Sequence, residues 1–132
     1  MWWKKFLEII SRVFPINPLS GIREDVLARL NPNKIYVENV RSLLGISHNQ
    51  ALRICETAVR QGYFERRVEV LCPDGRAAAS AEVEANLPSI VTCWQEEDGH
   101  YQEVELPTSD LQKLTYYRLN EQETARLYET TA

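Results

Sequence analysis

The stretch Gly45-Ile46-Ser47-His48-Asn49-Gln50 decides the fold expected of this chain. A glycine typical of a helix end, an isoleucine of the kind that is usually buried, and a serine typical of a helix start follow one another directly. The segment 37–44 before them and the segment 48–61 after them both repeat apolar residues at helical spacing. The sequence therefore predicts two helices joined by a tight turn.

Two more helices are expected on the amino-terminal side of this turn. The segment 2–14 has apolar residues at every third or fourth position, and Pro15 ends it. A second helix is predicted from residue 20 or 21 to residue 30, where Asn31-Pro32-Asn33 stops it. Ile35 and Tyr36 are expected to form a very short strand before the helix at 37–44. The amino-terminal half is therefore expected to be mainly helical.

Strand patterns follow in the second half of the chain. The segment 63–71 alternates, Pro73-Asp74-Gly75-Arg76 supplies a turn, and 76–83 returns as its partner. A second hairpin is expected from 89–95 and 101–106 around a turn at 96–99. A last strand at 114–119 and a polar tail at 120–132 complete the chain. The expected fold class is α+β.

Composition places the chain among globular proteins with one core and room for a small satellite. It has 132 residues, of which 44% are hydrophobic and 26% are charged. Its longest apolar run is far below the roughly 18 residues of a membrane span, and it has no leader-like start, so a cytoplasmic protein is expected. The chain has three cysteines, Cys55, Cys72 and Cys93, and no two of them have CxxC spacing. This odd number and the absence of a close pair predict reduced thiols rather than a disulfide framework.

Charge divides the chain into two dissimilar halves. Residues 1–70 carry 11 Lys and Arg against 7 Asp and Glu, a net charge of +4. Residues 71–132 carry 4 against 12, a net charge of −8, which brings the whole chain to −4. The first half suits an anionic surface, while the second half suits solvent or a basic partner.

A family resemblance is carried by Ser42-Leu43-Leu44-Gly45-Ile46-Ser47, followed fifteen residues later by Gly62-Tyr63-Phe64. This pattern resembles the winged helix-turn-helix of bacterial transcription regulators of the MarR and related classes. It implies a three-helix core plus a β-hairpin wing over residues 20–84. The amino-terminal helix and its connector would occupy residues 1–19, and a small acidic antiparallel β module with a polar tail would occupy residues 85–132.

The resemblance also implies a DNA interface, because the second helix of such a pair lies in the major groove and the wing touches the backbone. Asn and Gln side chains can read adenine, and Arg can read guanine or hold phosphates. The residues implied to contact double-stranded DNA are Ser47, His48, Asn49, Gln50, Arg53, Arg60, Arg66, Arg67 and Arg76. The expected function is that of a transcriptional regulator or a DNA-docking subunit, with a dimer expected.

An alternative function is that of a non-enzymatic adaptor in a bacterial multiprotein system, for example a defence system. Leu52 and Glu56 on the predicted recognition helix, and Asp74 beside Arg76, depart from a basic DNA-binding surface, and winged helices also dock proteins. The first helix can pack on its own core, form a homodimer or lie at a lipid interface. The side chains predicted to dock a partner there are Trp2, Trp3, Phe6 and Ile10.

Two segments, Leu71-Cys72-Pro73-Asp74-Gly75 and Thr92-Cys93-Trp94, look like the two knuckles of a zinc ribbon. Each has lost its second cysteine, and structural zinc needs four ligands, so this degenerate ribbon is predicted to bind no metal. Its two cysteines are expected to be small buried hydrophobic residues. The two histidines lie apart without a nucleophile and an orienting group, so no catalytic site, cofactor or small-molecule substrate is predicted.

Overall fold

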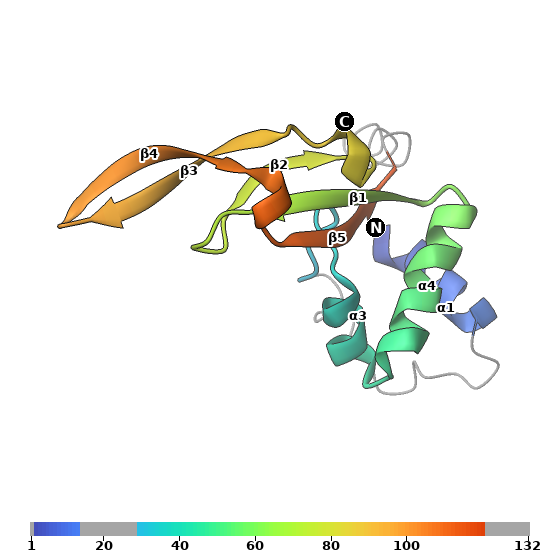
Figure 1. The fold of residues 1–132 in the computed structure, drawn as a ribbon. Helices are drawn as coiled ribbons and strands as arrows, with labels where there is room; N and C mark the ends of the chain where they lie inside the picture. Colours follow the sequence, from blue (N-terminus) through green and yellow to red (C-terminus); the bar gives the residue numbers. More distant parts are fainter. Residues whose placement is uncertain (1, 14–28, 121–132) are drawn as a thin grey trace, which may run out of the picture. The chain divides into compact units, whose positions relative to one another are not determined.

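The computed structural model describes residues 2–13 and 29–120, and its elements confirm the α+β class (Figure 1). In chain order the elements are α1 (Trp2–Val13), α3 (Val37–Leu44), α4 (His48–Arg60), β1 (Phe64–Leu71), β2 (Ala77–Ala81), η1 (Glu84–Asn86), β3 (Ile90–Glu97), β4 (His100–Pro107), η2 (Thr108–Asp110) and β5 (Lys113–Leu119). Most of the helix predicted at 20–30, together with the tail beyond residue 120, lies outside the described residues.

The chain divides into two compact units whose limits fall inside strands. Unit 1 comprises Met1–Arg66 and Tyr117–Ala132, and unit 2 comprises Arg67–Tyr116. This division cuts β1 and β5, whereas the sequence suggested limits at 19/20 and 84/85. Unit 1 has 12 Lys and Arg against 9 Asp and Glu, a net charge of +3, and unit 2 has 3 against 10, a net charge of −7. The charge asymmetry seen in the sequence therefore follows the structural units.

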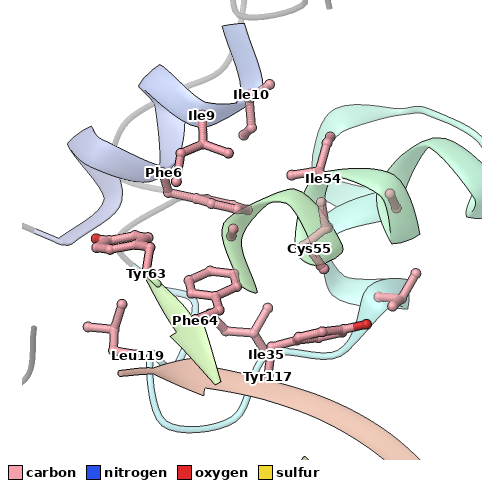
Figure 2. Packing of buried hydrophobic residues seen from close by; sticks show 14 residues of the cluster. Phe6, Ile9, Ile10, Ile35, Ile54, Cys55, Tyr63, Phe64, Tyr117 and Leu119 are labelled. Atoms are coloured by element: carbon pink, nitrogen blue, oxygen red, sulfur yellow. The ribbon is translucent and has the colours of Figure 1, made fainter. Parts of the chain in front are cut away.

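The core of unit 1 forms between the helices, the first residue of β1 and the last residues of β5. Figure 2 shows Phe6, Ile9 and Ile10 reaching from α1 toward the buried side chains of α4 and β1. The rings of Phe6 and Phe64 lie 5.1 Å apart between centroids. Ile35 and Tyr117 exchange two backbone hydrogen bonds of 2.7 Å, so the strand predicted at 35–36 is a single antiparallel bridge.

The turn between α3 and α4 forms where the sequence predicted it. Gly45 has φ +64°, a left-handed conformation that suits glycine, and its N–H donates to the Arg41 carbonyl at 2.9 Å. α3 spans the predicted residues 37–44, and α4 starts at His48 and ends one residue before its predicted end. The apolar face of α4 is buried in the core and consists of Ala51, Ile54, Cys55 and Ala58.

Unit 2 contains two antiparallel hairpins. β2 pairs with β1, and β1 lies between β2 and β5 in a three-stranded sheet, while β3 and β4 form a separate two-stranded sheet. Asp98 and Gly99 have φ values of +52° and +79°, so two residues turn the second hairpin, and not the four predicted. Consequently β3 and β4 extend as far as the pair Glu97 and His100.

A disulfide between Cys72 and Cys93 joins the two hairpins of unit 2, with their sulfurs 2.16 Å apart. The prediction of reduced thiols is wrong for these two cysteines and right for the buried Cys55, which is free. The predicted burial of Cys72 and Cys93 is confirmed, because both belong to the apolar cluster of unit 2 together with Val70 and Val91. Packing between the hairpins brings the two cysteine Cα atoms to 5.7 Å, which spacing along the chain did not indicate.

The disulfide also bears on the predicted cytoplasmic location. Disulfides are typical of oxidising compartments, so the cysteines no longer support a cytoplasmic protein. Over the described ranges 2–13 and 29–120, no helix is both long enough and apolar enough to cross a membrane.

Candidate nucleic-acid interface

The start of α4 is stabilised by two of the side chains predicted to contact DNA. The Ser47 hydroxyl accepts a hydrogen bond from the Gln50 N–H at 3.2 Å, and the Gln50 side-chain oxygen accepts one from the Ser47 N–H at 3.0 Å. This reciprocal capping box satisfies two backbone donors that a helix start leaves open. Ser47 and Gln50 are exposed, but their first role is to hold the end of α4.

Beside this cap, a carboxylate on α3 positions the exposed His48. The His48 Nδ1 lies 3.0 Å from Glu38, and the same carboxylate accepts a hydrogen bond of 2.6 Å from Arg41. Hydrogen bonds from Arg41 and then His48 lower the pKa of Glu38 below its ordinary value. Glu38 and Arg41 were not among the predicted site residues, although their spacing of three residues on one helix is the signal for such a pair.

Two arginines of α4 offer their charge to solvent. Arg53 and Arg60 are both exposed, and Arg60 donates to the Thr57 hydroxyl at 3.1 Å. That hydroxyl in turn donates to the Arg53 carbonyl at 2.7 Å. Among the residues that the structure describes, no carboxylate pairs with Arg53 or Arg60. These two guanidinium groups are therefore available to an anionic ligand.

The arginine at the start of the first hairpin is instead paired. Arg66 donates from Nε and Nη2 to Glu56 of α4, at 3.0 and 2.6 Å. This hydrogen bonding raises the pKa of Arg66 above its ordinary value. The pair leaves Glu56 electrically balanced at the surface of α4, so Arg66 offers little net charge of its own.

The other two predicted DNA contacts, Arg67 and Arg76, belong to unit 2 rather than to the unit that holds α4. Arg67 donates to the Ser80 hydroxyl at 3.3 Å, and Arg76 lies 3.5 Å from Asp74. The structure thus brings together the predicted residues of α4, while those of the hairpin are engaged with their own neighbours.

The residues predicted to dock a partner lie mostly inside unit 1. Phe6 and Ile10 are fully buried, Trp3 is 6% exposed and Trp2 is half-buried against the core. A partner-docking role is therefore wrong for Phe6 and Ile10, because fully buried side chains cannot contact a partner. Packing on its own core, one of the alternatives for this helix, describes them instead.

The two segments around Cys72 and Cys93 form no cluster of metal ligands among the described residues. Cys72 and Cys93 are bonded to each other, so neither sulfur is free to ligate an ion. Within the part of the chain that the structure describes, no three His, Cys, Asp or Glu side chains gather as metal ligands.

No family model, curated protein or solved structure matches this chain. The resemblance to winged helix-turn-helix proteins therefore rests on the residues around Gly45 and on the order of helices and hairpin that follows them.

Proposed function

We propose that this chain is a non-enzymatic DNA-binding protein, a winged-helix regulator or DNA-docking subunit, in which α4 enters the major groove. One observation carries the proposal. The tight α3–α4 turn leaves the start of α4 exposed, and the exposed face of α4 carries Arg53 and Arg60, which no carboxylate within the described residues neutralises.

The spacing of these side chains suits a single groove. Residues four and eleven positions apart lie on the same face of a helix, so Asn49, Arg53 and Arg60 form one stripe opposite the buried face of α4. Asn49 can bond an adenine edge, Arg53 a guanine or a phosphate, and Arg60 a phosphate. The exposed Leu52 beside them suits a thymine methyl group.

Glu56 also lies on this stripe, seven residues after Asn49, and its pairing with Arg66 fits the proposal. A bare carboxylate there would repel the phosphate backbone, and the bidentate hydrogen bonds with Arg66 cancel its charge. In the proposed complex, Arg66 acts by neutralising Glu56, and the β1–β2 hairpin serves as the wing.

The proposal is tested by fluorescence anisotropy of a labelled random-sequence DNA duplex titrated with the full chain at two salt concentrations. Replacing Arg53 and Arg60 by Gln is expected to weaken binding by about tenfold or more and to reduce the slope of log affinity against log salt by about 2. The double variant Arg12→Gln/Arg29→Gln removes the same charge from exposed positions outside the stripe and is expected to bind almost as tightly as the parent chain. Absence of DNA binding at low salt, or equal losses in both variants, would contradict the proposal.

The adaptor function is favoured by a separate observation in unit 2, on the β3–β4 hairpin.

A further inference from the structure

The β3–β4 hairpin has two faces with different surroundings. Residues directly opposite each other in an antiparallel pair share a face. Val91 and Cys93 are buried, and their cross-strand partners Leu106 and Val104 pack against the same apolar cluster of unit 2. The opposite face carries the pairs Ile90 with Pro107, Thr92 with Glu105, Trp94 with Glu103 and Glu96 with Tyr101.

This second face exposes large apolar side chains. Trp94 is 53% exposed, Tyr101 is 69% exposed and Ile90 is 56% exposed. The turn end of the hairpin projects beyond the β1–β2 turn within unit 2 (Figure 1). Aromatic rings left in water forgo the stabilisation that burial would bring, so a cluster of them on one face is typical of a contact surface.

The two rings alternate with carboxylates in a regular way. Trp94 lies opposite Glu103, and Tyr101 lies opposite Glu96, so the rings occupy one diagonal of the hairpin and the carboxylates the other. Glu105 lies on the same face, two residues from Glu103 along β4 and opposite Thr92. We call these five residues the aromatic–acidic face. Within the described ranges, no cationic side chain pairs with its three carboxylates.

Charge decides which partner suits this face. Unit 2 has a net charge of −7, so DNA, RNA and anionic lipid surfaces are repelled. A guanidinium group can stack on a Trp or Tyr ring while its N–H groups donate to a neighbouring carboxylate. Each ring of this face lies opposite a carboxylate, so Trp94 with Glu103 and Tyr101 with Glu96 can each provide both contacts. Lysine, a compact and strongly hydrated charge, cannot stack in this way.

We propose that the aromatic–acidic face docks an arginine-bearing segment of a partner protein. This interaction is independent of DNA binding by α4, because it uses other residues on the other unit. The chain would then connect DNA to a basic protein segment, which unites the adaptor function with the proposed DNA-binding function.

The test compares two labelled peptides of equal length and charge, one of alternating Arg and Gly and one of alternating Lys and Gly. Each is titrated with the full chain, and fluorescence anisotropy is measured at about 150 mM salt, where long-range charge effects are screened. The arginine peptide is expected to bind about fivefold tighter than the lysine peptide, as stacking on two rings predicts. Equal binding of both peptides, or binding of neither, would overturn the proposal.

A pair of matched double variants separates the face from net charge. Glu96→Gln/Glu103→Gln removes two carboxylates from the face, while Glu82→Gln/Glu97→Gln removes two that lie elsewhere, Glu97 being on the opposite side of the same hairpin. The first variant is expected to lose about tenfold in affinity for the arginine peptide and the second less than about twofold. Equal losses would show that net charge alone attracts the peptide and would overturn the proposal.

The aromatic contribution is tested with Trp94→Ala/Tyr101→Ala, which is expected to abolish the preference for arginine over lysine. Both side chains are exposed, so the variant is expected to fold, and a far-UV circular dichroism spectrum matching that of the parent chain checks this. If the preference for arginine persists in the folded variant, the face is not the docking surface.

A second copy of this chain is the alternative occupant of the face. If the parent chain self-associates in sedimentation and Glu96→Gln/Glu103→Gln abolishes this, the occupant is a second copy, and the proposed partner is wrong. At about 150 mM salt, where long-range charge effects are screened, DNA binding by the same variants is unchanged if the two functions are separate, so failure of one proposal does not imply failure of the other.

Discussion

At the scale of single residues, the buried Cys55 and Tyr117 link the stability of unit 1 to alkaline pH. Burial raises the pKa of Cys55 from 9.0 to about 12 and that of Tyr117 from 10.0 to about 12. The unfolded chain loses these protons at lower pH than the folded chain, so the stabilisation is complete below pH 9 and is lost as pH rises toward 12. We expect the free energy of unfolding, measured with urea, to fall over this window. Tyr117→Phe should flatten the fall, and Tyr101→Phe, at an exposed position, should not; a profile that stays level from pH 9 to 12 would contradict the prediction.

The Glu56–Arg66 pair gives a second prediction at this scale. Arg66→Gln leaves Glu56 uncompensated on the proposed DNA-reading stripe, and we expect weaker DNA binding. Glu56→Gln frees the guanidinium of Arg66, and we expect tighter binding with a salt slope steeper by about 1. Anisotropy titrations check both directions. Glu65→Gln, which breaks the comparable pair with Arg118, serves as the control and should leave DNA affinity unchanged. Changes in the same direction for both Glu56→Gln and Arg66→Gln would count against the proposed stripe.

At the scale of elements, the capping box of α4 is expected to stabilise the start of this helix. Ser47→Ala removes the side-chain acceptor for the Gln50 N–H and should lower the free energy of unfolding by about 1 kcal/mol. Urea denaturation followed by circular dichroism measures this loss. Ser42→Ala, an exposed serine within α3, is the matched control and should change stability little. Equal effects of the two substitutions would show that the cap does not stabilise α4.

The disulfide between the two hairpins gives a second prediction for elements. It joins positions 21 residues apart, and the loop that it closes corresponds to a stabilisation of about 3 kcal/mol in the chain-entropy model. Cys72→Ser/Cys93→Ser should lose about this much relative to the oxidised chain, in denaturation curves followed by tryptophan fluorescence. A reducing agent should destabilise the parent chain and not the variant. Three free thiols in the native, unreduced chain would show that the bond is absent.

At the scale of the whole molecule, the two units carry opposite net charge. Long-range repulsion of DNA by the acidic unit 2 can therefore be distinguished from local contacts by its dependence on salt. Removing any two carboxylates from the acidic unit 2 should strengthen DNA binding slightly at low salt, by about threefold or less, whichever pair is chosen. The effect should vanish at about 150 mM salt, where the Debye length is about 8 Å. Parallel DNA titrations of Glu96→Gln/Glu103→Gln and Glu82→Gln/Glu97→Gln check this. A gain in DNA binding that is confined to one pair and persists at about 150 mM salt would place that pair near the DNA and contradict the prediction.

Local signals in the sequence were sufficient for most of the elements. Gly45 and Ser47 mark the end of α3 and the start of α4 because the conformation of one and the side-chain hydrogen bond of the other act within four residues of the chain. The alternation of apolar residues indicated both hairpins for the same reason. The helical spacing of apolar residues over 48–61 also indicated the apolar face of α4, which is formed by Ala51, Ile54, Cys55 and Ala58.

Tertiary structure alone decided which side chains meet. Helical spacing shows that Phe6 and Ile10 share a face of α1, but only packing against α4 and Phe64 makes that face part of the core of unit 1. The Cys72–Cys93 bond and the pairing of Glu56 with Arg66 likewise depend on segments that are distant in sequence and adjacent in space. Sequence patterns report the conformation of neighbouring residues, whereas burial, bonding and charge compensation depend on contacts that exist only once the chain has folded.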